Sequence, residues 1–140
     1  MRSAGPRAVV VALSWLAACG SEGGAACPPH ADFYFASALT TPGTYQLELQ
    51  AIAGVSAACQ AEVSQTSFAS GACSAPEVSW IVSDVDLVGV HLEGTSEIVE
   101  LRLFDDDGVL GNVSIHPTYM ASPSACGACA PCAVESVPLP

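Results

Sequence analysis

The sequence contains no lysine, and its three arginines stand against 14 acidic residues, which gives a formal net charge of −11. Arg2 and Arg7 lie near the N-terminus, so the chain from Cys19 onward carries one positive and 14 negative side chains, a net charge of −13. Because such a surface repels phosphate groups, we expect no binding to nucleic acid. The lack of lysine in this part of the chain also excludes a P-loop and Schiff-base chemistry.

Common catalytic motifs are missing as well. The sequence contains no GxSxG, no HExxH and no glycine-rich phosphate loop. Asp84 and Asp86 form a carboxylate pair of the kind that glycosidases use, but 14 acids in a small domain produce such pairs by chance. We therefore expect no enzymatic activity and no cofactor, and an envelope hydrolase is the weakest of our alternatives.

Only one long apolar run occurs, and it lies at the N-terminus. The eleven uncharged residues AVVVALSWLAA follow Arg7 and end at Cys19. A transmembrane helix needs about 20 apolar residues, so this run is too short to be one. It has no polar face, unlike an amphipathic core helix. Its length and its basic flank are typical of a secretory signal peptide, which predicts export.

The end of this run, LAAC at Leu16–Cys19, resembles the lipobox of bacterial lipoproteins. The resemblance implies that residues 1–18 are a lipoprotein signal peptide and that Cys19 receives a diacylglycerol after cleavage. Each buried methylene contributes about 0.8 kcal/mol, so several acyl chains anchor a protein stably to a membrane. Gly20, rather than an aspartate, follows the cysteine, which favours the outer membrane. The alternative is ordinary signal cleavage that leaves Cys19 as a free or bridged thiol.

The cysteine count agrees with this prediction. Seven cysteines are an awkward number for an exported chain, and lipidation of Cys19 leaves six. Three disulfides are then expected among Cys27, Cys59, Cys73, Cys126, Cys129 and Cys132. Proximity favours a bond between Cys59 and Cys73, which would stabilise the fold by about 3 kcal/mol. We expect Cys27 to pair with one of the three C-terminal cysteines and the other two to pair locally.

The C-terminal CGACAPC motif also allows a metal site. Three thiolates at Cys126, Cys129 and Cys132 could bind Zn²⁺ or Cu⁺, with His116 or Cys27 as the fourth ligand. Thiols oxidise outside the cytoplasm, so disulfides remain the favoured prediction and no metal is expected. His91 is a further surface histidine, and it is expected to be solvated or hydrogen-bonded to a neighbour.

The rest of the chain has the pattern of a β-sandwich. We expect a tether at 19–31, a folded domain at 32–121 and an irregular cysteine-rich tail at 122–140. Short segments with alternating apolar residues recur about every ten residues, among them YQLELQA, CQAEVS and IVELRLF. This spacing predicts an all-β, antiparallel sandwich of about seven strands, stapled by disulfides. The first two of these segments are expected to form a hairpin.

The acidic stretch FDDDGVL is interpreted as a turn rather than a calcium site. With Gly108 at the sixth position of an EF-hand loop, Leu103 and Ser114 occupy the first and last ligand positions, where acids are needed. Strand phase instead predicts a three-residue loop at 106–108 with Gly108 in a left-handed conformation. This loop pairs Leu103 with Gly111 and, further along, Val99 with Ile115. A weak surface calcium site is the alternative.

The predicted sandwich is similar to immunoglobulin-like domains, but only in architecture. Trp80 follows both Cys59 and Cys73, whereas the buried tryptophan of antibody domains lies between the two bridging cysteines. The chain also resembles small bacterial lipoproteins that end in a tyrosine, here Tyr119, and a cysteine-rich tail. That resemblance implies no particular activity. We therefore expect a lipid-anchored envelope module that binds a protein or a small ligand or has a structural role.

Overall fold

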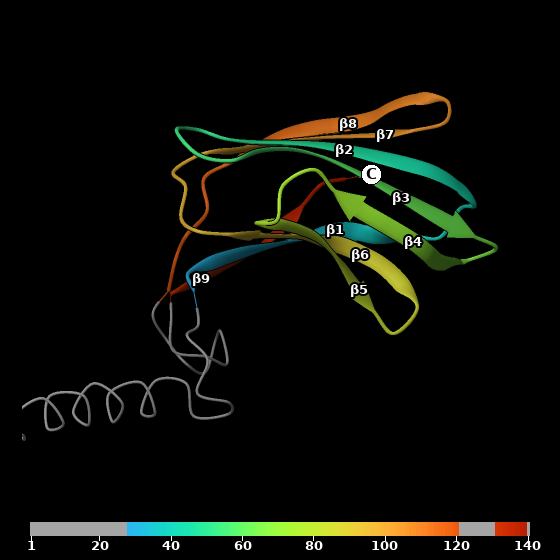
Figure 1. Cartoon of the computed structure of the whole chain (residues 1–140), viewed down its shortest axis with the longest axis horizontal. Coiled ribbons are helices and arrows are strands. Elements are labelled where there is room, and N and C mark those ends of the chain that lie inside the picture. Colours follow the sequence, from blue (N-terminus) through green and yellow to red (C-terminus); the bar gives the residue numbers. More distant parts are fainter. Residues whose placement is uncertain (1–27, 121–130, 140) are drawn as a thin grey trace, which may run out of the picture.

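The computed structural model describes residues 28–120 and 131–139, and in this part of the chain all regular structure is β. Nine strands form two sheets that stack as a sandwich (Figure 1). Sheet A has the order β5 (Val78–Ser83), β6 (Asp86–Glu93), β1 (His30–Leu39) and β9 (Cys132–Val137). Sheet B has the order β4 (Ser67–Cys73), β3 (Ser56–Ser64), β2 (Gly43–Ala51), β7 (Val99–Asp105) and β8 (Gly108–Ile115). No helix able to cross a membrane occurs in the described residues.

Side-chain alternation explains the central strands of sheet B. In β2 and β3 every second residue is buried, because successive side chains of a strand point to opposite faces. The two strands form the expected antiparallel hairpin, with Leu47 opposite Cys59 and Leu49 opposite Ala57. Strand β7 continues the pattern on the other side of β2, where Leu101 pairs with Leu49. The inward side chains of these strands make up half of the core.

The β7–β8 hairpin confirms the predicted register. Val99 lies opposite Ile115, Leu101 opposite Val113 and Leu103 opposite Gly111. Gly108 has a φ of 131°, a positive value as expected. The ladder closes more tightly than predicted, because Asp105 already pairs with Gly108 across a two-residue turn. The register shifts between Leu103 and Phe104, which marks a β-bulge. The one extra residue of this bulge keeps the inward residues of β7 and β8 on the same face despite the shorter turn.

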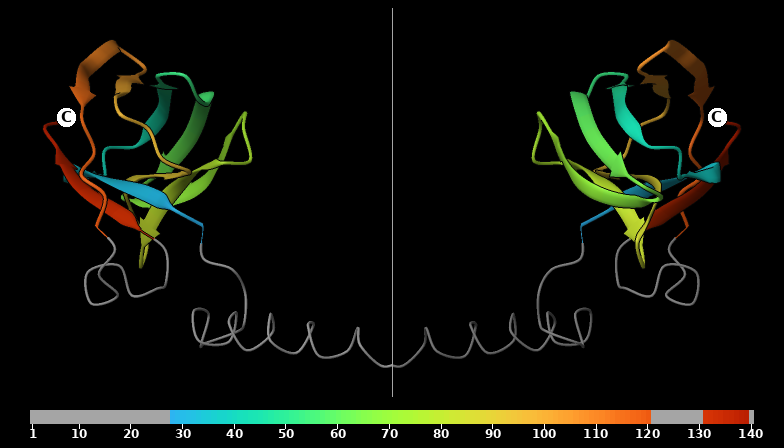
Figure 2. Two further views of the ribbon diagram at one scale, coloured as in Figure 1. Left: turned by 90° about the vertical axis from the view of Figure 1, so that its left-hand side faces the viewer. Right: turned by 90° about the vertical axis from the view of Figure 1, so that its right-hand side faces the viewer.

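The structure corrects three expectations about the extent of the domain. The described residues form nine strands rather than about seven. The expected tether overlaps β1, which begins at His30, and the expected irregular tail contains β9. Strand β9 pairs with β1 in parallel, so the first and last strands of the described chain lie side by side (Figure 2). The segment CAVESV is short and lies between prolines, which is why its sequence pattern gave a weak strand signal.

The strand order shows that the likeness to immunoglobulin domains is architectural. In those domains the first two strands are neighbours in one sheet. Here β1 pairs with β6 and β9, while β2 belongs to the opposite sheet. Trp80 also differs from the antibody tryptophan, because its indole lies over Gly71 of β4 and remains partly exposed.

Contacts on both sides of the sandwich join the two sheets. On one side, Phe68 N–H donates to the carbonyl of Val85, which joins β4 to the β5–β6 turn. On the other side, Ala36 N–H donates to the carbonyl of Leu139. The Leu139 side chain is only 2% exposed, and a Cβ at Gly111 of β8 would lie 2.6 Å from its Cδ2. The residues after β9 therefore complete the core between the two sheets.

Candidate functional site

The outer face of sheet B carries a hollow lined by polar side chains. Because Leu47, Leu49 and Ala51 point into the core, the alternating residues Glu48 and Gln50 point outward. The same alternation turns Glu100 and Arg102 of β7 outward. The inward apolar pattern therefore fixes which polar side chains share this face.

Strand register arranges these side chains in rows that run across the sheet. In one row, Glu48 lies opposite Arg102, which lies opposite Asn112 of β8. In the next row, Gln50 lies opposite Glu100, and Glu100 lies opposite Ser114. Directly opposed side chains on neighbouring strands have Cβ atoms about 5 Å apart, so each row places its polar groups within reach of one ligand.

The rows line an open groove of about 610 Å³. This volume is within the range of small-molecule sites, about 300–1,000 Å³. The outward side chains that line it are Glu48, Gln50, Ser56, Ala58, Ser74, Glu100, Arg102, Asn112 and Ser114. Inward residues such as Leu49 and Leu101 complete the lining.

Arg102 lines this groove, and it is the only lysine or arginine among the described residues. Its Nη1 lies 4.0 Å from Oε1 of Glu48, with both side chains more than half exposed, at 53% and 62%. An exposed ion pair of this kind contributes little free energy. Its guanidinium carbon also lies 6.0 Å from the ring centroid of Phe104. The guanidinium is thus loosely held at the surface, where its N–H groups can donate to a ligand.

A second polar cluster lies on the outer face of sheet A. His91 Nδ1 is 2.6 Å from Oδ1 of Asp32, and His30 Nε2 is 4.0 Å from the other oxygen of that carboxylate. The two imidazole rings have centroids 5.1 Å apart. The hydrogen bond to Asp32 is the main cause that raises the pKa of His91 above 6.5, with burial opposing it. His91 is therefore bonded to a neighbour, and His30 belongs to this cluster rather than to a tether.

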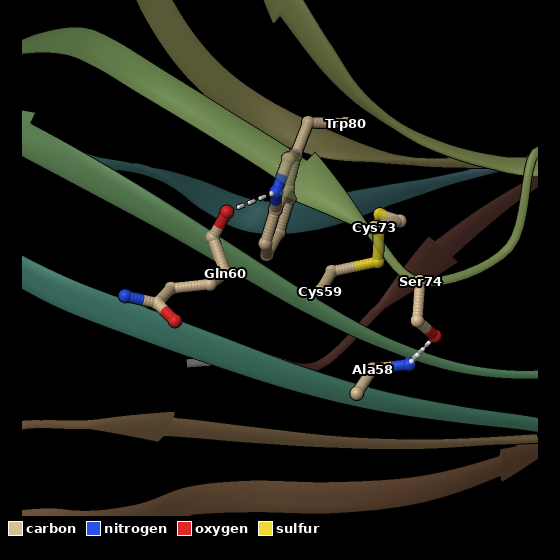
Figure 3. The surroundings of a disulfide bond; sticks show 6 residues. All are labelled: Ala58, Cys59, Gln60, Cys73, Ser74 and Trp80. Carbon is tan, nitrogen blue, oxygen red and sulfur yellow. Dashed lines mark hydrogen bonds between the residues drawn. A yellow bond between two sulfur atoms is a disulfide. The ribbon is translucent and has the colours of Figure 1, made fainter.

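The disulfide between Cys59 and Cys73 is confirmed. It joins two residues that lie directly opposite each other on β3 and β4 (Figure 3). Trp80 lies beside it, and its indole N–H donates to the carbonyl of Gln60 at 3.0 Å. Ser74 extends the ladder past the disulfide, since its Oγ accepts from Ala58 N–H. This covalent link ties the edge strand of sheet B to its neighbour.

Cys126 and Cys129 of the C-terminal cysteine motif lie outside the described residues. Cys19 and Cys27 lie outside them as well. Cys132 is described, lies buried at the start of β9 and is disulfide-bonded. His116 is exposed just after β8. Within residues 28–120 and 131–139, no group of three or more His, Cys, Asp or Glu side chains is placed to hold a metal ion.

The acidic pairs that the sequence singled out belong to turns. Asp84 and Asp86 lie at the β5–β6 hairpin, where Asp84 has a φ of 62°. In the β7–β8 hairpin, Asp105 Oδ1 accepts from the N–H of Asp107 at 2.8 Å. Asp106 Oδ2 accepts from Thr44 N–H at the start of β2. The turn interpretation of this acidic stretch is thus confirmed.

Sequence reasoning missed the groove. Each of its polar residues is unremarkable by itself, and together they are far apart in sequence, from Glu48 to Ser114. The signal that could have found them is the outward half of each alternating strand, combined with the correct strand order. The order of β3, β2, β7 and β8 in one sheet is a tertiary property, so the set appears only in the fold.

Comparisons of the chain with protein-family models, with curated proteins and with solved structures found no match. The chemistry of its surfaces is therefore the basis on which a function is inferred.

Proposed function

We propose that this protein is a lipid-anchored lipoprotein of the cell envelope, with its anchor in the outer membrane, and that it acts as a binding module. The lipobox-like LAAC sequence supports the proposed location in the cell envelope. The groove on the outer face of sheet B supports the binding role, and it is the single observation on which that role depends. A purely structural module would not need a hollow lined by converging hydrogen-bonding groups.

The short tether and the charge of the domain fit this role. Eight residues, 20–27, join Cys19 to the first described residue, and a chain of that length spans at most about 30 Å. A domain with a net charge near −13 is repelled by anionic lipid headgroups. The domain would thus stand close to the membrane without lying on it, with its sheets open to envelope components.

The other predicted functions have less support. A metal site at the C-terminal motif needs thiolates, and the sulfur of Cys132 is in a disulfide. A hydrolase at Asp84 and Asp86 would need these carboxylates to converge in a pocket. Asp84 lies in a hairpin turn, and Asp86 directly follows that turn.

Two experiments test the proposal, and the first tests whether Cys19 carries a lipid anchor. Bacteria that express the full chain are grown with radiolabelled palmitate, alongside the variants Cys19→Ser and Cys27→Ser. We expect label on the wild-type chain and on Cys27→Ser, and none on Cys19→Ser. Label that is absent from the wild-type chain would contradict lipid anchoring, and label that persists in Cys19→Ser would place it elsewhere.

The second experiment tests the groove. A photoreactive amino acid replaces Ser114 inside the groove or, as a control, Ser136 on the exposed outer face of β9. Irradiation of whole cells should give a discrete adduct with an envelope component from position 114 and none from position 136. Equal adducts from both positions, or none from either, would show that the groove has no selective occupant.

A further inference from the structure

We infer that the groove on sheet B binds a neutral oligosaccharide that lies across the strands. This inference rests on the proposed binding role of the groove and names the class of its ligand. It follows from the charge of the domain, the chemistry of the lining and the spacing of the rows.

The charge of the domain selects against anionic ligands. The described residues carry 13 carboxylates and one arginine, so phosphate- or carboxylate-rich molecules are repelled at long range. Within the groove, the guanidinium of Arg102 offsets one of the two carboxylates of Glu48 and Glu100, so the lining carries a net charge of only −1. A neutral ligand is therefore not repelled by the domain or by the groove.

The lining selects against apolar ligands. Among its outward side chains only Ala58 is apolar, and the others carry carboxylate, amide, hydroxyl or guanidinium groups. Displacing water from such groups costs free energy unless the ligand replaces their hydrogen bonds. Sugar hydroxyls both donate and accept hydrogen bonds. They match a surface on which acceptors such as Glu48 alternate with donors such as Arg102 and with amides such as Asn112.

The spacing of the rows suits a chain of sugar rings. Neighbouring strands of a sheet lie about 4.8 Å apart, which is close to the length of one pyranose unit. A chain laid along the row Glu48–Arg102–Asn112 would place successive rings over successive strands. The parallel row Gln50–Glu100–Ser114 would contact the other edge of each ring. Phe104, one row further along β7 on the same face, offers a partly exposed aromatic surface beside the middle of such a chain.

Calorimetric titration of the purified mature protein tests this inference. The probes are chitohexaose, cellohexaose and maltohexaose as neutral chains, with oligogalacturonate as the anionic control. We expect binding of at least one neutral chain and none of the anionic one. Arg102→Gln and Asn112→Ala should each weaken that binding by about tenfold or more, which is the usual effect of losing a hydrogen bond to a ligand. Ser136→Ala on sheet A should leave it unchanged.

The outcomes separate this inference from the proposed function. Fluorescence of Trp80 and thermal melting must show that each variant is folded before its affinity is compared. No binding of any neutral chain, together with a selective adduct from position 114, would overturn the oligosaccharide and leave the binding role intact. Binding that both groove variants retain at full affinity would place the sugar elsewhere and also overturn the inference.

Discussion

Replacement of Leu139 by alanine should destabilise the domain strongly, although the residue is the next to last in the sequence. Its side chain is 2% exposed and packs against β8 at Gly111. Leucine-to-alanine changes at fully buried sites cost about 2–5 kcal/mol, since they lose transfer free energy and leave a cavity. We expect about 3 kcal/mol, near the middle of that range. Leu110→Ala is the control, since Leu110 is 36% exposed.

Urea unfolding of a chain that begins at Cys19 measures this effect, and Trp80, the one tryptophan in that part of the sequence, reports it. Gly111→Ala extends the test, because its Cβ would lie 2.6 Å from the Leu139 side chain. Combined with Leu139→Ala, that methyl group fills part of the cavity, so the two changes should be less than additive by about 1 kcal/mol. A Leu139→Ala variant as stable as Leu110→Ala would refute the packing of this segment between the sheets.

Three further predictions concern other parts of the fold. Gly89→Ala should cost about 1–3 kcal/mol in urea unfolding, because its Cβ would meet the backbone of β1, whereas Gly54→Ala should be tolerated. The pKa of His91 is raised by its carboxylate partner on β1, so its stabilising effect is full below pH 6.5 and is lost as pH rises through the raised pKa. His91→Gln should remove that dependence, and an NMR titration with a pKa of His91 at or below 6.5 would contradict it. Loss of the Cys59–Cys73 bond in the double alanine variant should lower stability by about 3 kcal/mol, and an unchanged urea midpoint would argue against its contribution.

Much of the local structure could be predicted because strand alternation is a short-range signal. The apolar phase of β2, β3 and β7 identified their inward residues correctly, and phase alone gave the register of the β7–β8 hairpin. The Cys59–Cys73 pair followed from proximity in sequence, since hairpin neighbours are also neighbours in space. These features depend on residues within about 20 positions of one another.

The errors occurred where the pattern was weak or the contact was distant. Strand β9 has few residues and Glu135 on its inward side, so it looked like an irregular tail until its pairing with β1 was known. The sequence places His30 in a tether, because nothing nearby in sequence shows that it lies beside His91. In each case the missing information was a partner about 60 or more residues away.

The sequence by itself determined an acidic, lysine-free chain, an all-β fold and the inward face of most strands, because composition and alternation require no knowledge of distant contacts. The tertiary structure decided which strands are neighbours. Strand order placed Glu48, Arg102 and Asn112 in one row, joined the first strand to the last and brought Leu139 into the core. These contacts form only when two sheets pack face to face, since burial of both apolar faces fixes the order that no single segment encodes.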